Sequence, residues 1–142
     1  MVRRVLVAAA LALLIALPAA AQSGYRVIVN PVNPVSSLSK GKMWRLFLEQ
    51  AVWKNGDPVI PVDLPPTSPV REVFSSHALG MPAWVVAETW DRLADAGGHP
   101  PPALASDGEV LAFVRRKPGA IGYVSLDADV QGVKVVFVAK PR

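Results

Sequence analysis

Two histidines and no cysteine limit the chemistry open to this chain of 142 residues. Without a thiol there is no cysteine nucleophile and no thiolate metal site. His77 falls on or beside the apolar face of an expected helix, where a packed or partly exposed imidazole is the ordinary role. His99 stands in a Gly-Pro loop, where we expect it to be solvated. A two-histidine metal site needs a third ligand, and the sequence suggests none, so we expect no metal and no cofactor.

Paired carboxylates are the remaining route to catalysis. The pairs are Asp57 with Asp63, Asp91 with Asp95, and Asp127 with Asp129. The first pair flanks an expected strand. The second lies one turn apart on an expected helix, where solvated surface charges are the simpler interpretation. The third, in the stretch LDADV, could bind a hard cation but is more typical of a turn. The chain also lacks the GxSxG, P-loop, GxGxxG and HExxH motifs, so we interpret it as a non-enzyme.

The stretch SPVREVF, residues 68–74, offers a different chemistry. Ser68 is typical of a helix N-cap, and Pro69 is typical of the first helical position. The backbone amides of Val70 and Arg71 would then point out of the positive end of the helix, where an anion can dock. The stretch therefore predicts a capped helix start first and a weak oxyanion site second.

The role of Arg71 has two interpretations. Its side chain could reach back to an anion at the helix start, or it could be a surface arginine that pairs with Glu72, Glu49 or another carboxylate. Nearby hydroxyl groups could add donors if their loops converge on the helix start. The candidate anion ligands are Thr67, Ser68, Val70, Arg71, Ser36 and Ser37.

The first residues predict export. Arg3 and Arg4 precede an uninterrupted apolar stretch over residues 5–17, and Ala19 and Ala21 are the small residues of a cleavage site. We expect a signal peptide over residues 1–21 and a periplasmic domain over residues 22–142. An apolar stretch of about 13 residues is short for a bilayer span, so an uncleaved anchor is the less favoured alternative. After cleavage we expect no membrane anchor.

Charge gives little support to nucleic acid binding. The chain carries 15 basic and 11 acidic residues, and two of the basic residues are Arg3 and Arg4. Residues 22–142 therefore carry 13 basic and 11 acidic side chains, a net charge of +2. The longest basic run is the three residues at 115–117 and no basic-aromatic stripe is present, so we expect no nucleic acid partner. A remaining length of about 121 residues fits one modest domain.

Hydrophobic periodicity and turn signals place the elements that would position these residues. We expect strands at residues 25–30, 59–63, 120–125 and 133–138, with a proline-rich loop at 31–37. We expect helices at residues 40–50, 69–79 and 82–96, and a fourth, capped by Ser106 and Glu109, through 110–116. This order is typical of an α/β domain whose small central sheet is covered by helices.

Four tryptophans are many for a domain of this length. Trp44 and Trp90 fall on the apolar faces of expected helices, and we expect them in the core. Trp53 and Trp84 fall at the edges of elements, where contact with a partner is a more favoured role.

Three stretches in order resemble one protein family. They are NPVNPVSSLSKGKMWRLFLEQAVWKNGDPVIPVD, SPVREVF and VLAFVRRKPGAIGYVS. Together they resemble the periplasmic phosphate-binding proteins of ABC transporters, and more closely their short single-domain relatives. The Asn-Pro pair after a strand, the Trp53, Gly56 and Asp57 spacing and the intact PGAIGYV at 118–124 carry the resemblance, which covers residues from about 26 to 126.

The resemblance implies a fold, a ligand and a role. The fold would be a single lobe of the type II periplasmic-binding-protein-like class, an α/β domain with a small central mixed sheet and helices on both faces. The ligand would be phosphate or a similar oxyanion. The partner would be an ABC transporter or another envelope protein, and the role would be ABC-type phosphate uptake or sensing.

Departures from the family pattern imply weak binding. Pro69 and Val70 stand where the family has glycine and threonine, so an N–H donor and a hydroxyl are lost, and Leu64 replaces a preceding arginine. One lobe cannot close on a ligand by hinge motion, although a homodimer could rebuild a cleft. The alternative is a protein–protein interaction module of the cell envelope that kept the fold and lost the ligand, with Trp53 or Trp84 at the partner surface.

Overall fold

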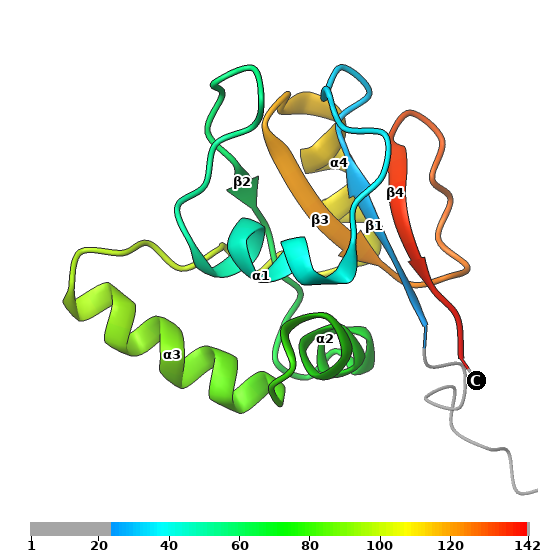
Figure 1. Cartoon of the computed structure of the whole chain (residues 1–142). Coiled ribbons are helices and arrows are strands. Elements are labelled where there is room, and N and C mark those ends of the chain that lie inside the picture. Colours follow the sequence, from blue (N-terminus) through cyan, green and yellow to red (C-terminus); the bar gives the residue numbers. More distant parts are fainter. Residues whose placement is uncertain (1–23, 142) are drawn as a thin grey trace, which may run out of the picture.

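The computed structural model describes residues 24–141 (Figure 1). The expected signal peptide at residues 1–21 lies outside the described residues. The elements follow the predicted order, with one addition. They are β1 (Tyr25–Val29), α1 (Lys40–Leu48), β2 (Ile60–Pro61), α2 (Pro69–Phe74), the π-helical turn η2 (Ser75–Leu79), α3 (Ala83–Asp95), α4 (Asp107–Arg116), β3 (Ala120–Val124) and β4 (Lys134–Ala139).

The four strands form one open mixed sheet in the order β2-β3-β1-β4. Strand β1 is antiparallel to both β3 and β4, and β2 is parallel to β3. Strand β1 is central and largely buried, as its apolar sequence YRVIV predicts. Strand β2 is shorter than predicted, and Pro61, which has no N–H to donate, suits its edge position.

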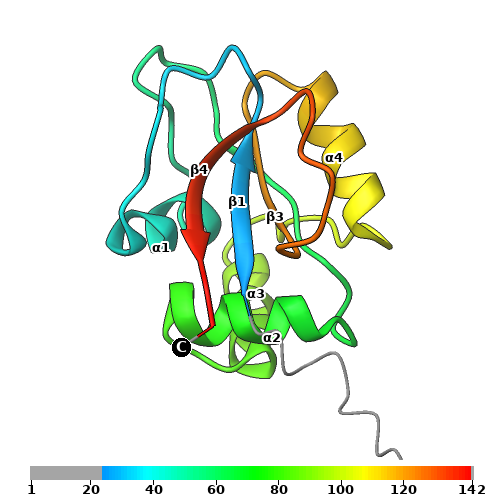
Figure 2. The same ribbon diagram turned by 90° about the vertical axis from the view of Figure 1, so that its right-hand side faces the viewer.

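Helices cover both faces of the sheet, which confirms the predicted fold class. Helix α4 lies on one face, and α1 and α2 lie on the other (Figures 1 and 2). The α4 contact is close: a Cβ atom on Gly122 of β3 would lie 2.7 Å from Val110 Cγ1 of α4. On the opposite face Phe74 of α2 stacks on Tyr123 with ring centroids 3.9 Å apart and meets Tyr25 edge-on at 5.3 Å.

The run predicted as one helix over residues 69–79 ends in a π-helical turn. The Ser75 N–H contacts both the Arg71 and Glu72 carbonyls, and Gly80 ends the run with φ 70°. Glycine reaches this left-handed conformation without Cβ strain. His77 lies in the turn, and its Nδ1 is 2.6 Å from the Tyr25 hydroxyl.

Two of the four tryptophan predictions were wrong. Trp53 is buried, with its indole N–H donating to the Gly119 carbonyl at 2.9 Å. Trp44 is 40% exposed instead of lying in the core. Trp90 is buried and Trp84 is 65% exposed, as predicted. The surface available for a partner therefore includes Trp84 but not Trp53.

Candidate anion site at the start of α2

Ser68 is the N-cap of α2, as predicted. Its Oγ accepts a hydrogen bond from the Arg71 N–H at 3.3 Å, and its own N–H donates to the Pro65 carbonyl at 2.9 Å. The first bond caps the helix and the second closes the turn that precedes it. The Ser68 hydroxyl proton remains able to donate, because a serine hydroxyl accepts and donates at once.

One first-turn amide of α2 has no acceptor within residues 24–141. Pro69 has no N–H, the Arg71 N–H contacts Ser68 Oγ, and the Glu72 N–H contacts the Ser68 carbonyl at 3.3 Å. The remaining group is the Val70 N–H. The helix start therefore offers an anion one backbone amide and one hydroxyl.

The side chain of Arg71 points inward. It is 7% exposed, its Nη1 donates to the Leu64 carbonyl at 2.9 Å, and its Nη2 lies 3.4 Å from Asp63 Oδ2. Asp63 is thus the carboxylate partner of this arginine, while Glu49 pairs with Arg45 at 3.4 Å. An anion at Ser68 would meet an arginine whose charge is already neutralised by a neighbour.

Asp63 also organises the loop that delivers Ser68. Its Oδ1 accepts from the Leu64 N–H at 2.9 Å and from the Tyr123 hydroxyl. Burial first, and then the charge of Asp63, raise the pKa of Tyr123 far above its ordinary value, so the phenol stays a protonated donor. This network was missed in the sequence, where the only signal was a carboxylate directly after a strand and an arginine eight residues later.

The other predicted ligands fall into two groups. Thr67 is exposed and directly precedes Ser68. Ser36 and Ser37 are exposed in the loop between β1 and α1, which lies beside β4, because the Leu38 N–H donates to the Val136 carbonyl at 2.9 Å. Strand β4 is at the sheet edge opposite β2, which leads to α2. The structure therefore brings Thr67, Ser68, Val70 and Arg71 together and places the two serines elsewhere.

The carboxylate pairs do not converge into a catalytic arrangement. Asp57 lies in the turn before β2, where its Oδ2 accepts from the Asn55 amide at 2.9 Å, whereas Asp63 lies after β2. Asp127 accepts from the Ser125 hydroxyl at 2.7 Å, which lowers the pKa of that carboxyl. Among residues 24–141, no three side chains of His, Asp or Glu gather as a metal site would require.

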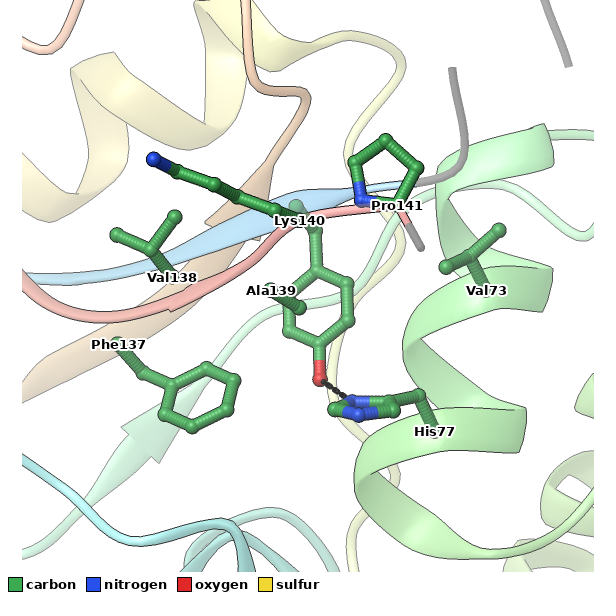
Figure 3. A pocket seen from close by; sticks show the side chains of 8 residues that line it. Val73, His77, Phe137, Val138, Ala139, Lys140 and Pro141 are labelled. Atoms are coloured by element: carbon green, nitrogen blue, oxygen red, sulfur yellow. Dashed lines mark hydrogen bonds between the residues drawn. The ribbon is translucent and has the colours of Figure 1, made fainter. Parts of the chain in front are cut away.

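A separate pocket of about 590 Å³ lies between η2 and the end of β4 (Figure 3). Tyr25, Phe137 and His77 form one side of it, and Lys140 lies near its rim. Burial raises the pKa of Tyr25 far above its ordinary value, so the phenol can donate to His77 throughout the physiological range. The pocket shares no residue with the start of α2.

Solved structures similar to this fold include proteins described as phosphate receptors or phosphate-binding proteins. An ABC-type phosphate transport receptor from Vibrio cholerae matches 81% of this chain with a TM-score of 0.61 and 15% identity. A putative phosphate ABC transporter substrate-binding protein with bound phosphate, from Clostridium perfringens, matches 81% with a TM-score of 0.58 and 20% identity. A possible phosphate binding protein from Planctomyces limnophilus matches 81% of this chain with a TM-score of 0.58 and 15% identity.

The chain has the fold of one lobe of a phosphate-binding receptor. It spans less than half of those receptors, namely 47%, 46% and 42% of their lengths. No family model and no curated protein matches the sequence. Helices long and apolar enough to cross a bilayer are absent from the part of the chain that the structure describes.

Proposed function

We propose that this protein is an exported solute-binding domain that binds phosphate or a similar oxyanion weakly, in ABC-type phosphate uptake or sensing. The observation that carries the proposal is the phosphate-receptor fold over 81% of the chain. The capped start of α2 supplies the donors: the Ser68 hydroxyl and the Val70 amide, with Thr67 beside them.

Weak binding follows from the donors that are present. Pro69 has no N–H, Val70 has no hydroxyl, and Arg71 is paired with Asp63. Two or three hydrogen bonds at a water-exposed helix start contribute roughly 1 kcal/mol each, or about 2–3 kcal/mol in total, which corresponds to a dissociation constant on the order of 10 mM.

The proposed setting is the periplasm, and the proposed partner is an ABC transporter or an envelope sensor. The receptors that share the fold are transport proteins, which supports a binding role in place of an enzymatic one. A homodimer that rebuilds a two-sided cleft stays a prediction. The alternative, a protein–protein interaction module, was based on Trp53 or Trp84 at the partner surface. It loses the first of these two residues, because Trp53 is buried.

A thermal-shift series on the exported, processed protein tests the proposal. Phosphate, sulfate and a phosphonate are titrated, and the melting temperature is expected to rise with at least one of them, because a ligand that binds only the folded state stabilises it. The variant Ser68→Ala should lose this rise.

Ser106→Ala is the matched control, because Ser106 caps α4 through the same type of bond, with the Glu109 N–H at 3.2 Å. Both variants lose about 1 kcal/mol of stability with the cap, but only the Ser68 variant should lose its anion response. A flat response of the wild-type protein to every anion would contradict the proposed function.

A further inference from the structure

Three segments meet at one end of the sheet, beside the last turn of α4. The Asn30 side-chain amide donates to the Val114 carbonyl at 2.9 Å and the Arg115 carbonyl at 3.1 Å, which ties the segment after β1 to α4. The Trp53 indole donates to the Gly119 carbonyl, which ties the turn at residues 54–57 to the residues after α4. Figures 1 and 2 show these segments at the same end of the molecule, opposite α2 and α3.

Three exposed cations lie on the segments that meet at this end, here called the basic end and defined by Val32, Lys54, Arg116 and Lys117; the turn that carries Lys54 also carries one exposed carboxylate, Asp57. The three cations are exposed, and none of them forms an ion pair within residues 24–141. Arg115 is excluded because its guanidinium donates to the Gln131 carbonyl at 2.6 Å. The helix dipole accounts for cations at the end of α4, but it does not account for Lys54, which comes from a separate turn.

Val32 is exposed at the basic end, in a loop that several hydrogen bonds hold. Its side chain is 71% exposed, although its N–H donates to Asn30 Oδ1 at 3.1 Å. The Val35 N–H donates to Asn33 Oδ1 at 2.9 Å, and Lys134 Nζ donates to the Asn33 and Val35 carbonyls at 2.5 and 2.8 Å. These bonds fix the loop, so exposing the valine requires no further ordering.

We propose that the basic end docks on an anionic membrane surface. Val32 enters the boundary between headgroups and acyl chains, and the three cations lie over anionic headgroups. An aliphatic tip beside cations suits a lipid interface better than a nucleic acid, because Trp53, the aromatic residue that the three described segments contain, is buried and offers no ring for a base to stack on. Docking at this end leaves α2 facing away from the membrane, so the inference does not rest on the proposed anion site.

Vesicle co-sedimentation of the exported, processed protein tests this inference. Vesicles of phosphatidylcholine alone are compared with an equal mixture of phosphatidylcholine and phosphatidylglycerol. We expect binding to the mixture, weaker binding to the neutral vesicles, and a fall in binding as salt is raised. Absence of binding to the mixed vesicles at low salt would overturn the proposal.

Charge reversal provides the matched comparison. Arg116→Glu with Lys117→Glu should weaken binding by about 25-fold or more, since each cation near such a surface contributes about 5-fold. Lys40→Glu with Lys42→Glu makes the same change in net charge on the exposed side of α1 and should leave most of the binding intact. Equal losses in the two variants would mean attraction by net charge alone and would overturn a specific docking surface.

Substitutions of Val32 distinguish a lipid surface from an acidic protein surface as the partner of the basic end. Val32→Asn should weaken vesicle binding and Val32→Trp should strengthen it, because the tip residue enters the interface. Both substitutions are made at an exposed site, so melting temperatures should stay near that of the wild type. If neither variant changes binding, the tip does not enter lipid and the inference fails.

Discussion

Replacing Asp63 by asparagine tests how much the negative charge of Asp63, beneath the start of α2, contributes to stability. Asparagine keeps the shape of the side chain and an acceptor for the Leu64 N–H and the Tyr123 hydroxyl. It removes the negative charge 3.4 Å from Arg71 Nη2. Arg71 is 7% exposed and keeps the Leu64 carbonyl as its main partner, so its positive charge is left largely uncompensated.

The expected cost is large for a single isosteric change. Breaking a buried ion pair by removing one partner costs about 3–5 kcal/mol. The side chains of Arg71 and Asp63 are 9% and 14% exposed, so water reaches the pair slightly. The cost should therefore lie at the lower limit of this range. We expect a loss of about 3 kcal/mol in the free energy of unfolding, or roughly 12 °C in melting temperature for a domain of this size.

Urea denaturation followed by tryptophan fluorescence measures this cost. Asp91→Asn is the control, because Asp91 is an exposed carboxylate on α3 and its loss should change stability by less than about 0.5 kcal/mol. The double variant Asp63→Asn with Arg71→Met should be more stable than the sum of the single changes by about 1 kcal/mol or more. A cost of Asp63→Asn below about 1 kcal/mol, or strict additivity, would refute the reasoning.

Three further predictions concern packing and ionisation. Gly122→Ala should destabilise the protein by about 1–3 kcal/mol in urea, because the new Cβ would lie 2.7 Å from Val110 Cγ1; a neutral result would contradict the close packing of α4 on β3. Gly41→Ala, on the open side of α1, should stabilise by roughly 0.5–1 kcal/mol, and a loss would mean that the site is crowded. Tyr25 and Tyr123 have folded-state pKa values raised above their ordinary value of 10.0, so the stability they contribute is complete below that pH and falls as pH rises beyond it. In an alkaline titration phenolate absorbance should therefore appear together with unfolding, and phenolate formation in the folded state would contradict this.

The sequence predicted the elements well because local signals determine them. The period of apolar residues located the helices, and Ser68 and Ser106 mark starts that the structure confirms as capped. The π-helical turn was not predictable in this way, because its signature is a hydrogen-bond pattern and the residue spacing resembles that of an ordinary helix. Gly80 ends the helical run in the structure, as the sequence predicted.

Side-chain burial was predicted less well wherever it depends on a distant segment. Trp53 was predicted to lie at the edge of an element, but its loop folds against Gly119, where a side chain would collide with the Pro58 carbonyl. The burial of Arg71 depends on Asp63, which lies across a proline-rich turn. Both cases require the path of a loop, which hydrophobic periodicity does not report.

The pairing of Tyr25 with Ala139 has a consequence for engineering. Paired strands lie about 5 Å apart, so the two ends of the described domain leave the sheet side by side. The domain is therefore suited to insertion into a surface loop of a host protein with short connectors on either side. Joining its ends and opening the chain in the exposed turn at Asn55 and Gly56 should likewise give a circular permutant that keeps the sheet order β2-β3-β1-β4.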